Sequence, residues 1–219
     1  MRMFALAGLL LAAVSGLWAG PVTLLFDDVE TLDSVIMPPG YGGLQWDNVR
    51  ISRGEFPGSS GYQSGMVSAP NVASNSLGNP ASFSLASGTF TLQSLYATAA
   101  WSEGLEATFT GFLGANQVYQ TSVQLSIQSP SLLQLDWSGI NRVVFSGTGG
   151  VDDPNDLGRG SHIVLDNIAF SEFPVSEIPE PGTFGLLAGG LSLAALHRRF
   201  RNRPAAGPDV SVPVHGSRE

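Results

Sequence analysis

The chain has 219 residues, which is enough for one sizeable domain with appendages. It contains 27 glycines, 14 prolines, no cysteine and only 13% charged residues, a composition typical of a turn-rich β protein, and it excludes disulfides and thiol chemistry. Between residues 20 and 172, fourteen Asp and Glu side chains outnumber four arginines, which argues against nucleic acid as a partner of this region.

The first 19 residues have the features of a secretory signal peptide. Arg2 precedes an apolar run from Met3 to Val14, and a cleavage site follows Ala19. We therefore predict that residues 1–19 are a signal peptide and that the chain is exported through the inner membrane. A permanent N-terminal anchor is the alternative, although the apolar run is short for a membrane span of about 20 residues.

Residues 20–172 contain short β-rich runs separated by Gly, Pro, Ser and Asn. Alternation is clearest in QTSVQLSIQ, where Val123, Leu125 and Ile127 share one face. No window of about 11 residues or more keeps a helical period, so we predict an all-β, jelly-roll-like antiparallel β-sandwich. The expected strands are 22–26, 44–52, 81–85, 89–98, 105–112, 117–128, 131–136, 142–146 and 162–170.

Carboxylates lie in or beside the first and the last expected strands, which are often neighbours in jelly rolls. Because Ca²⁺ takes about 6 to 8 oxygen ligands, we predict a structural calcium site formed by Asp28, Glu30, Asp166 and backbone carbonyls. The alternative is that these acids cap strands and solubilise the surface. A second acidic segment, VDDPNDLG at 151–158, lacks the ligand spacing of an EF-hand and is expected to be a solvated loop.

Catalytic machinery is scarce between residues 20 and 172. His162 is the single histidine there, and no Gly-x-Ser-x-Gly elbow surrounds a serine. Glu103 and Glu106 are the best carboxylate pair for glycoside hydrolysis, but nothing in their spacing selects them, and a loop is expected. We predict that the chain is not an enzyme, with a glycoside hydrolase as the less favoured alternative.

Two aromatic residues are the candidate ligand-binding residues. Tyr41, in PPGYGG, and Trp101, at a strand end, are expected to be exposed, and aromatic faces suit carbohydrate rings. Trp46 and Phe90 fall within strand patterns and are expected in the core.

The C-terminal region combines three features. Pro179, Glu180 and Pro181 end a linker at 173–181, and an uncharged stretch from Gly182 to Leu196 follows. A helix of that length rises only about 22 Å, short of a hydrocarbon core of about 30 Å, so the bilayer must thin or the flanks must snorkel. We predict a short transmembrane helix with its arginines at 182–203, cytoplasmic arginines, and a disordered tail at 204–219. The arginines are Arg198, Arg199, Arg201 and Arg203.

The Pro-Glu-Pro triplet, the Gly-rich apolar span and the arginine cluster together resemble the PEP-CTERM sorting signal of exopolysaccharide-producing Gram-negative bacteria. The resemblance implies transient handling by an exosortase that cuts near the triplet. It also implies membrane anchoring before processing and a cell-surface or extracellular address afterwards. The tail after Arg203 is longer than the family's usual few basic residues. A plain C-terminal anchor is the alternative.

Several segments, including LLFDD, YGGLQWDNVRIS, INRVVFSGTGG and HIVLDNIAF, resemble the jelly-roll domains common in PEP-CTERM proteins. Those domains are related to galactose-binding-like and carbohydrate-binding modules, so the resemblance implies a fold more than a ligand. The expected function is an exported surface or matrix protein with a non-enzymatic structural or adhesive role in the exopolysaccharide or biofilm layer. The alternative is a carbohydrate-binding module whose partner is extracellular polysaccharide.

Overall fold

A computed structural model describes residues 20–55, 60–155 and 158–173. The expected signal peptide, the Pro-Glu-Pro triplet, the transmembrane helix with its arginines and the tail lie outside these residues. Within the described part of the chain, no helix is long and apolar enough to cross a membrane.

The described residues form mostly strands, with one short helix, α1 (Gly61–Ser64). The strands are β1 (Val22–Leu24), β2 (Ser34–Ile36), β3 (Gln45–Asp47), β4 (Val49–Arg53), β5 (Asn71–Asn75), β6 (Ala81–Ser84), β7 (Thr89–Ala99), β8 (Ser102–Glu103), β9 (Leu105–Leu113), β10 (Asn116–Leu125), β11 (Ser131–Ile140), β12 (Arg142–Thr148), β13 (Val151–Asp152) and β14 (Ile163–Phe173).

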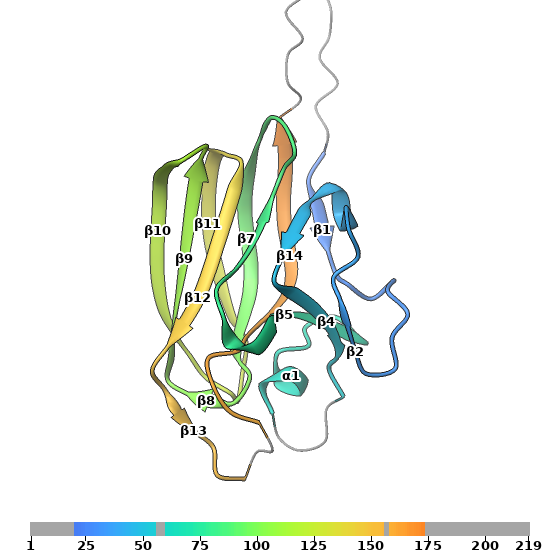
Figure 1. Ribbon diagram of the computed structural model, residues 1–219, viewed down its shortest axis with the longest axis vertical. Helices are drawn as coiled ribbons and strands as arrows, with labels where there is room; N and C mark the ends of the chain where they lie inside the picture. Colours follow the sequence, from blue (N-terminus) through green and yellow to red (C-terminus); the bar gives the residue numbers. More distant parts are fainter. Residues whose placement is uncertain (1–19, 56–59, 156–157, 174–219) are drawn as a thin grey trace, which may run out of the picture. The chain divides into compact units, whose positions relative to one another are not determined.

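These strands build the predicted all-β antiparallel sandwich (Figure 1). One sheet has seven strands, in the order β11-β7-β14-β5-β4-β2 with β1 beside β14. The other has five, in the order β10-β9-β12-β6-β3, and β13 and β8 form a separate two-stranded ribbon. The first and last strands of the sandwich, β1 and β14, are neighbours, with Val22 opposite Phe170.

The core fills the space between the two sheets, because side chains alternate along each strand. On β9, Leu105, Ala107 and Phe109 are fully buried while the residues between them are not. Phe109 pairs with Phe145 on β12, and their rings stack with centroids 6.1 Å apart. Burying such aromatic side chains is the main source of stability in a sandwich without disulfides.

The clearest predicted alternation is confirmed in β10 and the residues that follow it. Leu125 and Ile127 are buried, and Val123 is half-buried against the core. Ser122 and Gln124 are exposed on the opposite face.

The single strand expected at 44–52 is wrong, because the chain changes sheets in its middle. β3 belongs to the five-stranded sheet and β4 to the seven-stranded sheet. The turn is made by Asn48, whose φ of 56° lies in the left-handed region that Asn tolerates. Its side-chain amide donates hydrogen bonds to the carbonyls of Ser76 (3.2 Å) and Pro80 (3.0 Å), which fixes the crossing point.

A second, smaller cluster covers part of the outer face of the seven-stranded sheet. The segment that contains α1 packs Tyr62 onto Val72 of β5 and Val164 of β14, together with Ala100 and Trp101. Because Ala73 faces the core between the sheets, β5 is buried on both faces.

Candidate functional site

Asp166 of β14 holds the chain that follows α1 onto the sheet; we call residues 60–68, which include α1, the α1 segment. Its carboxylate, fully buried, accepts hydrogen bonds from the backbone N–H groups of Val67 (2.7 Å), Ser68 (2.8 Å) and Asn167 (2.8 Å) and from the Ser68 hydroxyl (3.2 Å). Burial raises the pKa of Asp166 to about 6, although these four hydrogen bonds oppose the shift. The oxygens that were expected to bind calcium are therefore engaged by donors of the chain itself.

The other two expected calcium ligands, Asp28 and Glu30, are exposed. Asp28 accepts a hydrogen bond of 2.7 Å from the hydroxyl of Tyr41. Among the described residues, no three His, Cys, Asp or Glu side chains are grouped so that they could hold a metal ion. Asp28, Glu30 and Asp166 therefore do not form such a group. Calcium binding itself stays a prediction.

Tyr41 was expected to be exposed, but it is half-buried and connects neighbouring parts of the fold. Its ring is half-buried and stacks on Phe26 at 5.7 Å, and its hydroxyl accepts a hydrogen bond from the Phe26 N–H (3.1 Å) while donating to Asp28. Burial and the Asp28 carboxylate raise the pKa of Tyr41 well above its usual value. One side of Tyr41 lines a hollow of about 370 Å³ beside Gly42.

Phe90 and Trp46 were both expected to lie in the core. Phe90 is fully buried, as predicted. Trp46 is half-buried and packs on Phe83, with ring centroids 5.3 Å apart, and its indole N–H donates to the Tyr41 carbonyl at 2.9 Å.

The expected exposure of Trp101 is wrong, because only 8% of this residue is accessible. Tyr62 lies against it with ring centroids 5.2 Å apart, and the backbone of Gly158 lies on the indole so closely that a Cβ there would be 2.2 Å from it. His162 meets the indole edge-on at 6.4 Å. These partners are 39 to 61 positions away in the sequence, so no local pattern around Trp101 indicates its burial.

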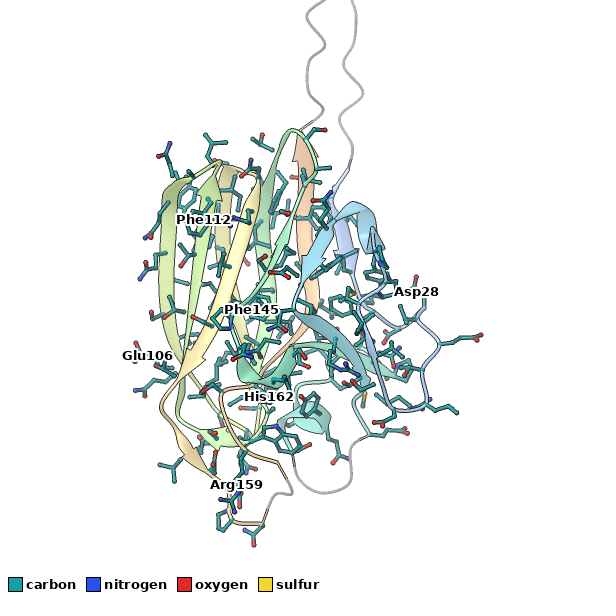
Figure 2. The ribbon with its side chains drawn as sticks, viewed as in Figure 1. Asp28, Glu106, Phe112, Phe145, Arg159 and His162 are labelled. Carbon is teal, nitrogen blue, oxygen red and sulfur yellow. The ribbon has the colours of Figure 1, made fainter. Side chains whose placement is uncertain are left out.

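Trp101 nevertheless lines a cavity of about 280 Å³, which we call the Trp101 pocket. It opens on the outer face of the seven-stranded sheet, beside α1 and the start of β14; Figure 2 labels His162 at its wall. The residues that line it are Ser34, Arg50, Ser52, Tyr62, Ser74, Asn75, Ser76, Leu77, Trp101 and His162.

The pairing of β2, β4 and β5 brings the polar residues of this pocket together. Ser34 of β2 lies opposite Ser52 of β4, and Arg50 of β4 lies opposite Ser74 of β5. The intervening Ile51 is buried between the sheets, so alternation sends Arg50 and Ser52 to the outer face. The alternation V-R-I-S at residues 49–52 already indicates that Arg50 and Ser52 share one face, but Arg50 was not predicted as a site residue.

Hydrogen bonds fix the orientation of the polar groups. Arg50 donates from Nε to the Ser34 hydroxyl (2.9 Å) and from Nη2 to the Ser34 carbonyl (3.0 Å). The Tyr62 hydroxyl lies 3.4 Å from the Ser74 hydroxyl, to which it donates, and 3.2 Å from Nδ1 of His162. Burial lowers the pKa of His162 and raises that of Tyr62, so both side chains are neutral at pH 7.

The two glutamates considered for glycoside hydrolysis are not in a loop, so that expectation is wrong. Glu103 ends β8 and its Oε2 accepts hydrogen bonds from the Ser126 hydroxyl (3.0 Å) and the Ile127 N–H (2.9 Å). Glu106 lies on β9 opposite Gln124, on the outer face of the five-stranded sheet (Figure 2). The acidic segment after residue 150 begins with β13, where a solvated loop was expected.

Comparisons with known proteins add little to this picture. No protein-family model matches the chain, and no curated protein matches it significantly. Among solved structures, TmCBM61 in complex with β-1,4-galactotriose is 12% identical with a TM-score of 0.32, over 62% of this chain and 94% of that one. A DUF4465 family protein from Bacteroides ovatus is 9% identical with a TM-score of 0.40, over 70% and 94%. Because both TM-scores are below 0.5, neither similarity argues for a shared ligand.

Proposed function

We propose that this chain is an exported, non-enzymatic surface or matrix protein whose sandwich holds a saccharide unit in the Trp101 pocket. The observation that carries the proposal is the combination of ring-bearing walls, Tyr62, Trp101 and His162, with hydroxyls and a guanidinium in one cavity. This combination suits a saccharide, because the apolar faces of sugar rings pack against aromatic rings while hydroxyl groups need polar partners.

The size of the cavity limits what it holds. Small-molecule sites span roughly 300 to 1,000 Å³, and the Trp101 pocket, at about 280 Å³, lies just below this range. We therefore assign it one sugar unit of a polymer, with the remainder of the polymer outside. Such a site gives weak single contacts, and many copies on a surface give adhesion through multivalency.

The position of the pocket supports an adhesive role. β1 and the last residues of β14 are paired, so both ends of the sandwich lie at the same end of the molecule, whereas α1 lies towards the other (Figure 1). His162 precedes β14 and Phe173 ends it, a separation of roughly 35 Å at 3.3 Å per residue. The pocket and the C-terminal end of the sandwich therefore lie at different ends of the domain, which leaves the pocket accessible when the chain is attached through its C-terminal residues.

A glycan array probed with the purified full chain tests this proposal. We expect binding to a subset of glycans, and a Trp101→Phe substitution should weaken it roughly threefold to tenfold because ring contact is lost. Phe112→Leu is the matched control, because Phe112 lies on β9 in the five-stranded sheet and does not line the pocket. The Arg142 guanidinium lies 4.4 Å from the centre of its ring. No binding to any glycan, or equal loss in both variants, would contradict the proposal.

A further inference from the structure

We propose that the Trp101 pocket prefers sugar units that carry a carboxylate, such as uronic acids, and that Arg50 is the residue that binds this carboxylate. This inference rests on the proposed saccharide site and names the chemical class of its ligand.

The first step is that Arg50 forms no ion pair within 4 Å with any acid of the described residues, although Asp47 lines a neighbouring hollow with it. Within residues 20–55, 60–155 and 158–173, the ion pair within 4 Å is the one between Arg53 and Glu55, and no carboxylate lies that close to Arg50. A guanidinium stays protonated at every relevant pH. Arg50 is half-buried, so water screens its charge only in part and the charge can act on a ligand in the pocket.

The second step is that nothing else in the pocket is charged at neutral pH. The other lining residues are serines, an asparagine, a leucine and the three ring-bearing residues, and both Tyr62 and His162 are neutral. Between residues 20 and 172 acids outnumber bases fourteen to four, whereas the one charged side chain that lines this pocket is a base. The pocket therefore favours an anionic ligand.

The third step is geometric. The two hydrogen bonds to Ser34 fix the plane of the Arg50 guanidinium and use Nε and one proton of Nη2. The protons of Nη1 and the second proton of Nη2 form a fork that matches the two oxygens of a carboxylate. Tyr62 and Trp101 line the same cavity with the small accessible parts of their rings, 5% and 8% of each residue, and these edges are the apolar contacts available to the sugar.

Titration calorimetry with the purified full chain tests the preference, using a galacturonic acid trimer, its methyl ester and a galactose trimer as probes. The ester has nearly the same shape as the acid but no charge. We expect the acid to bind roughly tenfold to a hundredfold more tightly than the ester, because a charged hydrogen-bonded pair is lost in the ester. A glucuronic acid trimer and its ester provide a second pair of the same chemistry.

Two substitutions of Arg50 and one control substitution of Arg142 test whether the effect belongs to Arg50. Arg50→Gln should remove the preference for the acid while leaving the affinity for the ester within about threefold, and Arg142→Gln, outside the pocket, should leave both unchanged. Arg50→Lys keeps the charge without the fork and should give an intermediate preference. The comparison of acid with ester on the unsubstituted chain stands even if a variant fails to fold.

The outcomes separate the two proposals. If the acids and the neutral probes bind equally, or only the neutral probes bind, the carboxylate preference is overturned while the saccharide site stands. If none of these probes and no glycan of the array binds, the saccharide site itself is wrong. A preference for the acid that survives Arg50→Gln would assign the anion to another place.

Discussion

Burial in the fold changes the titration of the Asp166 carboxyl group. Its pKa of about 6 is raised above the value of about 3.9 for an unfolded chain, since burial disfavours the charged form. Between these two values the folded chain holds a proton that the unfolded chain has released. The contribution to stability is therefore complete below about pH 4 and is lost as the pH rises through about 6.

The predicted result is a free energy of unfolding that falls by up to about 3 kcal/mol between pH 4 and pH 7 on account of this one group. Urea titrations at a series of pH values measure it. In Asp166→Asn this part of the slope should disappear, although the variant is less stable at pH 4 because its amide N–H₂ faces backbone donors. Asp47→Asn, at an exposed carboxylate, is the control. An identical slope in all three chains would contradict the assignment.

At the candidate site, the sequence predicts the positions of residues along strands but not their distant contacts. The sequence places Asp166 on the last strand, but the donors that occupy it come from residues 98 and 99 positions earlier. Burial of Trp101 likewise depends on Gly158 and Tyr62. Residue types and strand alternation can be read locally, whereas these long-range partners cannot.

At the scale of elements, periodicity predicted the long strands well. The expected strands at 89–98, 105–112 and 142–146 correspond to β7, β9 and β12, because one face of each is buried and the other is not. β5, with the sequence NVASN, was missed because the α1 segment buries its outer face and so removes the alternation. The turn at Asn48 was missed because its positive φ leaves no hydrophobic signature.

The α1 segment depends on glycine at the point where it meets the sheet. The N–H of Gly61 donates to the Ala100 carbonyl at 2.9 Å, and a Cβ at Gly61 would lie 1.7 Å from the Ala99 carbonyl oxygen. Gly61→Ala should therefore push the segment off the sheet, cost roughly 3 kcal/mol, and lower the melting temperature by about 5 to 10 °C.

Thermal unfolding followed by circular dichroism measures this effect, and glycan binding should fall with it because Tyr62 leaves the Trp101 pocket. Gly114→Asn is the matched control, since Gly114 has a φ of 61° with open space around it, which Asn tolerates. If Gly61→Ala melts within about 1 °C of the unsubstituted chain, the close packing of the segment on β7 is refuted.

At the scale of the whole molecule, the fold and the proposed address are compatible. The sandwich begins and ends on paired strands, so the chain enters and leaves it at one end. The Trp101 pocket, beside α1, lies towards the opposite end of the sandwich (Figure 1). The Pro-Glu-Pro triplet follows β14 in the sequence, so cutting there, if it occurs, would leave every strand of the sandwich in one piece.

Replacement of Pro179, Glu180 and Pro181 by alanine tests the sorting proposal. If the triplet directs cutting, mass spectrometry of the unsubstituted exported protein should show the apolar stretch 182–196 missing, and the variant should remain full-length in the membrane fraction. If the stretch is a membrane span, the arginines after it should hold it in the bilayer until the cut, since positive residues resist transfer to the outer side. Pro204→Ala, beyond those arginines, should be processed normally. An intact tail on the unsubstituted surface protein would instead favour a plain anchor, in which case the same tether holds the pocket at the surface permanently.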